Sequence, residues 1–134
     1  MREAVIVSVA RTPIGKAYRG AFNDLPAPSL AAVAIKAAVE RAGVDPSEID
    51  DCIFGAALQQ GSQGFNFARH AAMAAGLPVS VGGMTLDRQC SSGLMAIASA
   101  AKQIVCDGSQ VVLAGGCESI SLVQTDKMNM DRAV

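Results

Sequence analysis

The stretch LDRQCSSGLMAI, residues 86–97, places a cysteine among small polar residues directly before an apolar, alanine-rich run. We expect a strand to end at Leu86 and a helix to run from Cys90 to about Cys106. A cysteine in the first turn of a helix lies near unpaired backbone N–H groups and the positive end of the helix dipole, which favour a thiolate. Cys90 is therefore a candidate nucleophile. The alternative is an inert, buried thiol in a strand-to-helix turn capped by serines.

The rest of the chain alternates short apolar runs with helical patterns. Ser29 is a predicted N-cap, and Gly43 is the predicted stop of the same helix. The order β-α-β-α-β-α-β predicts an α/β fold with a mostly parallel sheet and flanking helices. We expect strands over residues 5–9, 52–57, 84–86 and 111–114, and helices over 29–42, 66–75 and 90–106.

The predicted helix after residue 90 carries no charge before Lys102. A helix that is apolar or small on every side is normally buried on every side. A simple three-layer sandwich leaves one face of each helix in water. We therefore expect this helix to need a second layer on its outer face, which a single domain of 134 residues has little material to supply.

Composition excludes several classes of function. The formal net charge of -1 gives no excess of positive charge that would favour binding to nucleic acid or to an anionic membrane. No segment has the sustained apolarity of a membrane span, and the run at 4–10 is interpreted as a strand and not as a signal peptide. The four cysteines form no C-x-x-C pair and cannot complete a usual zinc set with the single His70. We expect free thiols, no metal and a cytoplasmic location.

Four separated segments resemble the thiolase family in the family's order: Ala10–Lys16, Asn66–Arg69, Leu86–Ile104 and Gly115–Ser119. The third of them resembles the family's active-site cysteine signature, matching it in Cys90, Ser92, Gly93, Leu94, Ala96, Ile97 and Ile104. The resemblance implies that residues 1–118 form the N-terminal half-domain of the thiolase fold. Residues 119–134 would then open the CoA-binding excursion, and the C-terminal repeat is absent from this sequence.

The resemblance also implies an activity. Cys90 would take an acyl group from a coenzyme A thioester, with its backbone N–H as one oxyanion donor. The acyl group would pass to CoA in thiolytic cleavage of a 3-ketoacyl-CoA, or to a second acetyl-CoA in the reverse Claisen condensation. Acyl-CoA and CoA are then substrates and no cofactor is bound permanently. Fatty acid metabolism and a homodimer or homotetramer are further expectations of this kind.

The family's activating histidine, second cysteine and oxyanion-hole histidine lie in its C-terminal half, so this chain needs that half from the same or another chain. We expect the isolated chain to be inactive. His70 matches no catalytic motif and is assigned a structural or interface role. Cys52, Cys106 and Cys117 are interpreted as small apolar residues. Asp87 stands where many members carry Asn, and it either opposes a thiolate or caps the helix.

Three other interpretations compete with an assembled thiolase. A truncated thiolase-like domain can persist as a non-catalytic binding or assembly module. Another condensing enzyme of the same fold, such as a ketoacyl synthase, would use a carrier-protein substrate. A thiol-redox protein is the least favoured, because no resolving cysteine lies near Cys90 in the sequence.

Overall fold

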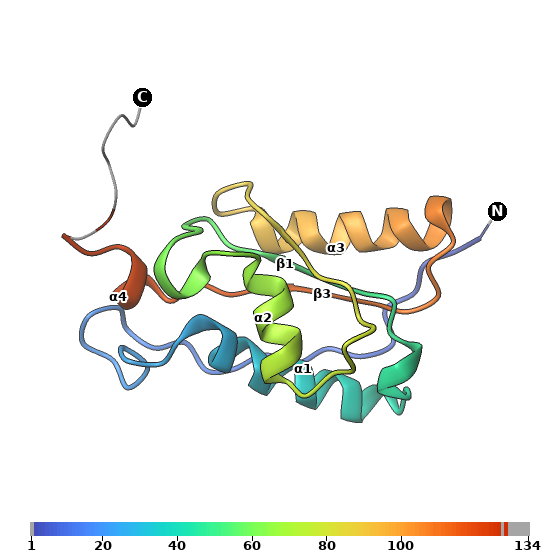
Figure 1. Cartoon of the computed structure of the whole chain (residues 1–134), viewed down its shortest axis with the longest axis horizontal. Helices are drawn as coiled ribbons and strands as arrows, with labels where there is room; N and C mark the ends of the chain where they lie inside the picture. Colours follow the sequence, from blue (N-terminus) through green and yellow to red (C-terminus); the bar gives the residue numbers. More distant parts are fainter. Residues whose placement is uncertain (1, 127, 129–134) are drawn as a thin grey trace.

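The computed structural model describes residues 2–126 and 128, and a parallel sheet of three strands lies at its centre (Figure 1). The strands are β1 (Asp51–Gly55), β2 (Met84–Leu86) and β3 (Val112–Gly116), in the order β2-β1-β3. Ile53 of the central strand is in register with Met84 on one side and Ala114 on the other. All three strands run in the same direction, so their carboxyl ends meet at one edge of the sheet.

Helices cover both faces of this sheet. In Figure 1, α3 (Ser92–Lys102) lies on one side of the strands, and α1 (Ala27–Ala42) and α2 (Phe67–Ala74) lie on the other. Alternate residues of β1 point to opposite faces, as strand geometry requires. Cys52 and Phe54 pack in the larger apolar cluster with α1 and α2, whereas Ile53 packs against α3. The predicted α/β class, with a parallel sheet and flanking helices, is confirmed.

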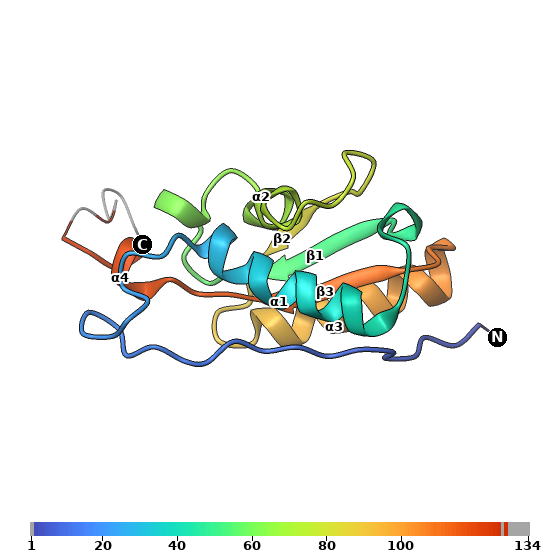
Figure 2. The same cartoon turned by 90° about the horizontal axis from the view of Figure 1, so that it is seen from below.

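The N-terminal segment departs from the prediction. Val5–Val9 was predicted as a strand, but residues 2–10 form no strand and make no backbone-to-backbone hydrogen bond with any described residue. The segment runs the length of the molecule on the β3 side (Figures 1 and 2). Arg2 donates to the Gly108 carbonyl oxygen, and the Arg41 guanidinium donates to the Val9 carbonyl oxygen. β-branched residues favour extended backbone, but a strand also needs a hydrogen-bonding neighbour, which this segment lacks.

The start of α1 also differs from the prediction. Ser29 is not the N-cap, because the helix begins at Ala27 and Pro26 takes the cap position. Pro28 lies in the first turn, where a missing N–H removes no helical hydrogen bond, so the helix can begin before it. The predicted stop is confirmed: Gly43 follows the helix with φ 65°, the left-handed conformation that glycine adopts readily.

The remaining elements are short. The predicted turn near residue 46 is the 3-10 helix η1 (Pro46–Glu48), and the predicted polar loop contains η2 (Gly61–Gln63). A π-helical turn, η3 (Gln103–Asp107), continues α3. After β3 the chain forms α4 (Ile120–Val123), which no sequence pattern indicated. The predicted segment 119–134 is otherwise only partly described, since residues 127 and 129–134 lie outside the described residues.

No helix in the described ranges, 2–126 and 128, is long and apolar enough to cross a membrane.

Candidate active site

Cys90 lies in the turn that leads from β2 to α3. The helix was predicted to begin at Cys90, but it begins at Ser92 with Ser91 as its N-cap, so the cysteine precedes the first helical turn. Residues 88–92 form a turn instead: the Ser91 and Ser92 N–H groups donate to carbonyl oxygens three residues back, and Gln89 has a left-handed φ of 51°. Cys90 is exposed. A sharp turn between a strand and a helix presents a nucleophile to a ligand in other enzymes, and this turn presents a thiol in that way.

Side chains on both sides of Gln89 hold this turn in place. A carboxylate oxygen of Asp87 accepts a 2.7 Å hydrogen bond from the Gln89 backbone N–H. The Ser92 hydroxyl accepts a 2.8 Å bond from the Arg88 N–H and donates a 2.6 Å bond to the Gln89 carbonyl oxygen. Asp87 therefore caps the turn before Cys90 and not the first turn of the helix.

Three glycines bring the start of α3 against the ends of the strands. A Cβ added at Gly55 would lie 2.2 Å from the Ser92 carbonyl carbon, closer than any real Cβ contact. A Cβ added at Gly116 would lie 3.1 Å from the Cα of Gly93. The helix backbone thus rests directly on the carboxyl ends of β1 and β3. This contact fixes the position of the Cys90 turn relative to the sheet.

The four cysteines fall into two groups. Burial, aided by the neighbouring negative charge of Asp51, raises the pKa of the Cys52 thiol to about 12. Burial and the charge of Glu118 raise the pKa of Cys117 to about 11. Both thiols therefore stay protonated at neutral pH and are poor nucleophiles. The exposed thiols, Cys90 and Cys106, are the ones that a reagent or substrate can reach.

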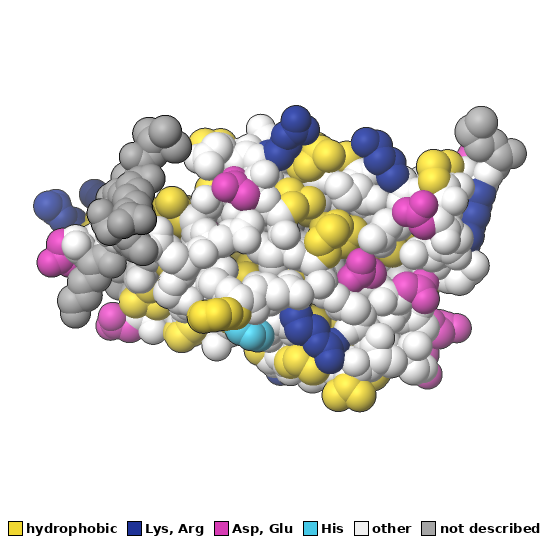
Figure 3. Space-filling model, turned by 45° about the horizontal axis from the view of Figure 1, so that its top comes forward, with side chains coloured by type: hydrophobic (Ala, Val, Ile, Leu, Met, Phe, Trp, Pro, Cys, Tyr) yellow, Lys and Arg dark blue, Asp and Glu magenta, His cyan; other side chains and the backbone are white. Residues whose placement is uncertain are grey.

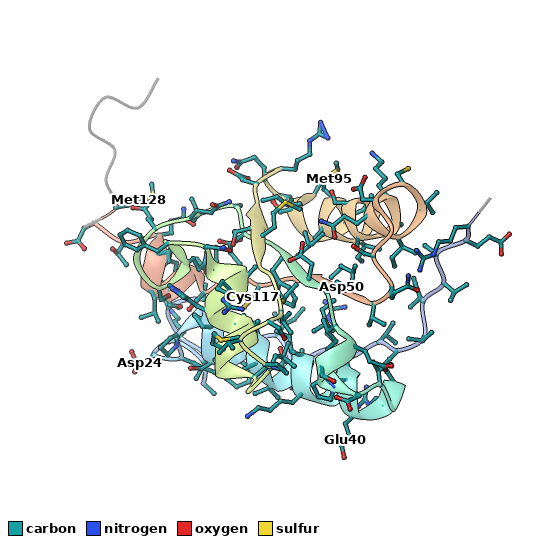
Figure 4. The ribbon with its side chains drawn as sticks, turned by 45° about the vertical axis from the view of Figure 1, so that its right-hand side comes forward. Asp24, Glu40, Asp50, Met95, Cys117 and Met128 are labelled. Atoms are coloured by element: carbon teal, nitrogen blue, oxygen red, sulfur yellow. The ribbon has the colours of Figure 1, made fainter. Side chains whose placement is uncertain are left out.

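The helix distinguishes these two exposed cysteines. Cys90 precedes the amino end of α3, and Cys106 lies in η3 beyond its carboxyl end. The helix dipole favours negative charge at the first position and disfavours it at the second. Arg88 adds no direct contact to the thiol; its guanidinium reaches along α3 to the sulfur of Met95, at 3.7 Å. Figure 4 shows Met95 on the α3 side and Cys117 nearer the middle of the molecule.

His70 is not joined to Cys90. It is exposed on α2, which packs on the face of the sheet opposite α3. Within the described ranges, no hydrogen bond or ion pair links the imidazole to the thiol. The same residues contain no group of three His, Cys, Asp or Glu side chains that could hold a metal ion.

The outer face of α3 beside Cys90 is open. A shallow hollow there is lined by Arg88, Ser91, Leu94, Met95 and Ala98. The Leu94 side chain is 72% exposed, and Ile97 is also exposed. Figure 3, which brings the α3 side forward, shows hydrophobic side chains between basic ones on this face. The helix that was expected to need a second layer therefore has its outer face uncovered in this chain.

Sequence reasoning missed a buried polar network at the same edge of the sheet. The Glu118 carboxylate accepts hydrogen bonds from the backbone N–H groups of Ala57 and Leu58, at 2.8 and 3.1 Å. The Gln63 amide is fully buried; it donates to Glu118 and accepts from the Ser119 N–H. The loop after β1 is thereby tied to the turn after β3. Glu118 lies in a family-like segment, but nothing in its spacing indicated Gln63 as a partner.

Comparison with known proteins gives a consistent result. The sequence-family model of the thiolase N-terminal domain matches residues 4–133 of this chain. The acetyl-CoA acetyltransferase of Cupriavidus necator is 49% identical over 121 residues, which are 90% of this chain and 30% of that protein. The 3-ketoacyl-CoA thiolase of Bacillus subtilis is 46% identical over 123 residues, 92% of this chain and 32% of that protein.

A solved structure agrees with these relatives. The crystal structure of the Bacillus anthracis acetyl-CoA acetyltransferase superimposes with a TM-score of 0.85 and 45% identity, over 90% of this chain and 30% of that one. The chain thus spans about a third of the length of the relatives it matches. The family match, the sequence identity and the fold agree, and the chain belongs to the thiolase family, of which it represents the N-terminal domain.

Proposed function

We propose that Cys90 is the acyl-accepting nucleophile of a thiolase that transfers acyl groups between coenzyme A thioesters. One observation carries the proposal: Cys90 is an exposed thiol in a hydrogen-bonded turn at the amino end of α3, whereas Cys52 is buried, Cys117 is partly buried, and both have raised pKa values. The names of the relatives, acetyl-CoA acetyltransferase and 3-ketoacyl-CoA thiolase, support the same class of reaction.

The proposed reaction has two acyl transfers. The Cys90 thiol gives its proton to a base, and its sulfur adds to the thioester carbonyl carbon, whose oxygen becomes an oxyanion. The oxyanion then collapses, the bond from the carbon to the sulfur of CoA breaks, and CoA leaves as its thiol after taking the proton back from the base. On this proposal the Cys90 backbone N–H donates to the transient oxyanion. CoA, or the carbanion of a second acetyl-CoA, then takes the acyl group and releases the Cys90 thiol. Acyl-CoA and CoA enter as substrates, with no permanently bound cofactor.

Completion of this site requires residues from outside the described chain. No general base is hydrogen-bonded to Cys90 within residues 2–126 and 128. We propose that the C-terminal thiolase half supplies a histidine and a second cysteine and covers the outer face of α3. On this proposal residues 119–134 begin the CoA-binding excursion, and the assembled protein is a cytoplasmic homodimer or homotetramer.

Intact mass before and after exposure to acetyl-CoA tests the proposal directly. The protein is measured alone and together with its C-terminal half, and the modified residue is mapped. We expect one acetyl group on Cys90 in the assembled protein, and none when Cys90→Ser replaces it. Cys106→Ser is the matched control and should still accept the acetyl group. An assembled protein that stays unmodified, or is acetylated on Cys106 instead, contradicts the proposal.

A non-catalytic assembly module is the second candidate. The uncovered apolar face of α3 favours it, because such a face serves docking whether or not Cys90 reacts. The two functions separate in the same experiment. An assembly module binds the C-terminal half without becoming acetylated, whereas an enzyme does both.

A further inference from the structure

We infer that the Ser92 hydroxyl is a positioning group for Cys90, an inference that rests on the proposed function of that cysteine. Ser92 does not reach out of the protein, since its side chain is buried with 4% of its surface exposed. Its hydroxyl accepts from the Arg88 N–H at 2.8 Å and donates to the Gln89 carbonyl oxygen at 2.6 Å. One side chain of the helix thus holds the two residues that directly precede Cys90.

The backbone conformation of Gln89 explains why the Ser92 hydrogen bonds are needed. Its φ of 51° is unfavourable for a residue that carries a Cβ. Relaxation of Gln89 to an ordinary conformation would rotate Cys90, which comes next, away from the amino end of α3. The Ser92 bonds oppose that relaxation from a buried position, where no water competes for them. Asp87 braces the other side of Gln89 through its N–H, but it is exposed and competes with solvent.

Ser92 is itself fixed on the sheet. Its backbone lies against Gly55, where a Cβ would approach to within 2.2 Å of the Ser92 carbonyl carbon. A continuous series of contacts therefore joins the central strand to Ser92, and Ser92 to the turn that contains Cys90. Ser91, one position nearer to Cys90, is exposed, and its hydroxyl caps no group among the described residues. The two adjacent serines are alike in the sequence and unlike in their contacts.

The four cysteines provide the assay within one molecule. The protein is treated with iodoacetamide, and each cysteine is quantified by peptide mapping. Cys106 is exposed in η3, beyond the far end of α3, so it reports general thiol reactivity, while the buried Cys52 is protected only when the protein is folded. Ser92→Ala removes both bonds of the hydroxyl and should lower the ratio of Cys90 to Cys106 labelling by at least about fivefold, the factor that corresponds to the loss of one buried hydrogen bond. Ser91→Ala is the matched control and should leave that ratio unchanged.

A second variant separates positioning from general damage. Gln89→Gly makes the left-handed conformation inexpensive, so the double variant Gln89→Gly with Ser92→Ala should regain most of the labelling ratio. If Ser92→Ala alone unfolds the protein, labelling of Cys52 will show it. The double variant then still tests whether Ser92 acts through the backbone conformation of Gln89. An unchanged or raised ratio in folded Ser92→Ala, an equal loss in Ser91→Ala, or no rescue by Gln89→Gly would overturn the inference. Failure of the proposed function is distinct, since it shows as absence of acetylation on Cys90 in the unsubstituted, assembled protein.

Discussion

The four thiols of this chain differ more clearly in their burial than in the residues that flank them in the sequence. The sequence singled out Cys90 and assigned Cys52 and Cys117 as small apolar residues, although Cys117 also stands in a segment that resembles the family. That assignment agrees with the complete burial of Cys52 and the partial burial of Cys117, and this burial raises the pKa values of both thiols. Cys106 differs, because it is exposed. It lies beyond the carboxyl end of α3, where the helix dipole disfavours negative charge.

The raised pKa of Cys52 makes stability depend on alkaline pH. An unfolded chain loses this proton near pH 9.0, while the folded protein keeps it until about pH 12. The stabilisation is complete below the lower value and is lost as pH rises toward the upper one, with a slope of about 1.4 kcal/mol per pH unit for one thiol. Cys52→Ala should therefore show a flatter decline in the free energy of unfolding between about pH 9 and about pH 11. Urea unfolding of both proteins in a reducing buffer measures this, and parallel pH curves would contradict it.

Asp87 provides a charge test beside Cys90. Asp87→Asn keeps an oxygen that can accept from the Gln89 N–H and removes the negative charge. Alkylation of Cys90 should accelerate by about twofold at low ionic strength, and the difference should shrink at high salt because exposed charges are screened. The labelling of Cys106 in the same sample is the control. A slower Cys90 reaction in Asp87→Asn would mean that the charged carboxylate braces the turn better than the amide does.

At the scale of elements, the close contact of α3 with the strand ends depends on backbone without side chains. Gly55→Ala forces a Cβ into the Ser92 backbone, and we expect a loss of about 1–3 kcal/mol in the free energy of unfolding, as overpacking typically costs. Gly93→Ala is the matched control. Its added Cβ meets nothing closer than 3.8 Å, and alanine in a helix should gain up to about 1 kcal/mol. Urea unfolding compares the two, and equal effects would show that the contact at Gly55 is not the cause.

The sequence predicted helices and strands well where the local pattern determines the structure, and poorly where the structure depends on a neighbouring segment of the fold. Residues 84–86 form the predicted strand, and Gly43 ends the predicted helix. Val5–Val9 has the composition of a strand, but composition cannot supply the neighbour that a strand needs. The start of α3 was misplaced because the turn over residues 88–92 contains no glycine or proline to indicate it. The sequence around Cys90 indicated it as a candidate, and its role stays a prediction, whereas the buried Gln63 had no local signal at all.

At the scale of the whole molecule, the described residues leave at least two apolar surfaces open to solvent. One is the outer face of α3, and another is the extended N-terminal segment, whose Val5, Ile6 and Val7 side chains are each more than two thirds exposed. A chain that spans about a third of its relatives' length leaves room for further polypeptide to cover both. The exposed apolar area is what a soluble monomer avoids, so the isolated chain should self-associate.

Leu94 tests that expectation. Its side chain is 72% exposed, so Leu94→Glu should leave the free energy of unfolding within about 0.5 kcal/mol and reduce self-association of the isolated chain. Sedimentation velocity over a range of concentrations measures the association. Lys102→Glu, also on α3 but outside the apolar face, is the matched control and should leave association unchanged. If Leu94→Glu associates as strongly as the unsubstituted chain, the α3 face is not the contact surface.

The contact between Arg2 and Gly108 joins residues 106 positions apart, and this has a consequence in time. A ribosome adds about 5–20 residues each second, so the second of these residues follows the first by roughly 5–20 seconds. Throughout that interval Arg2 cannot make this contact, whereas Arg41 can already donate to the Val9 carbonyl oxygen, because only 32 positions separate those two residues. The end of this segment near Val9 can therefore be secured several seconds before the end near Arg2.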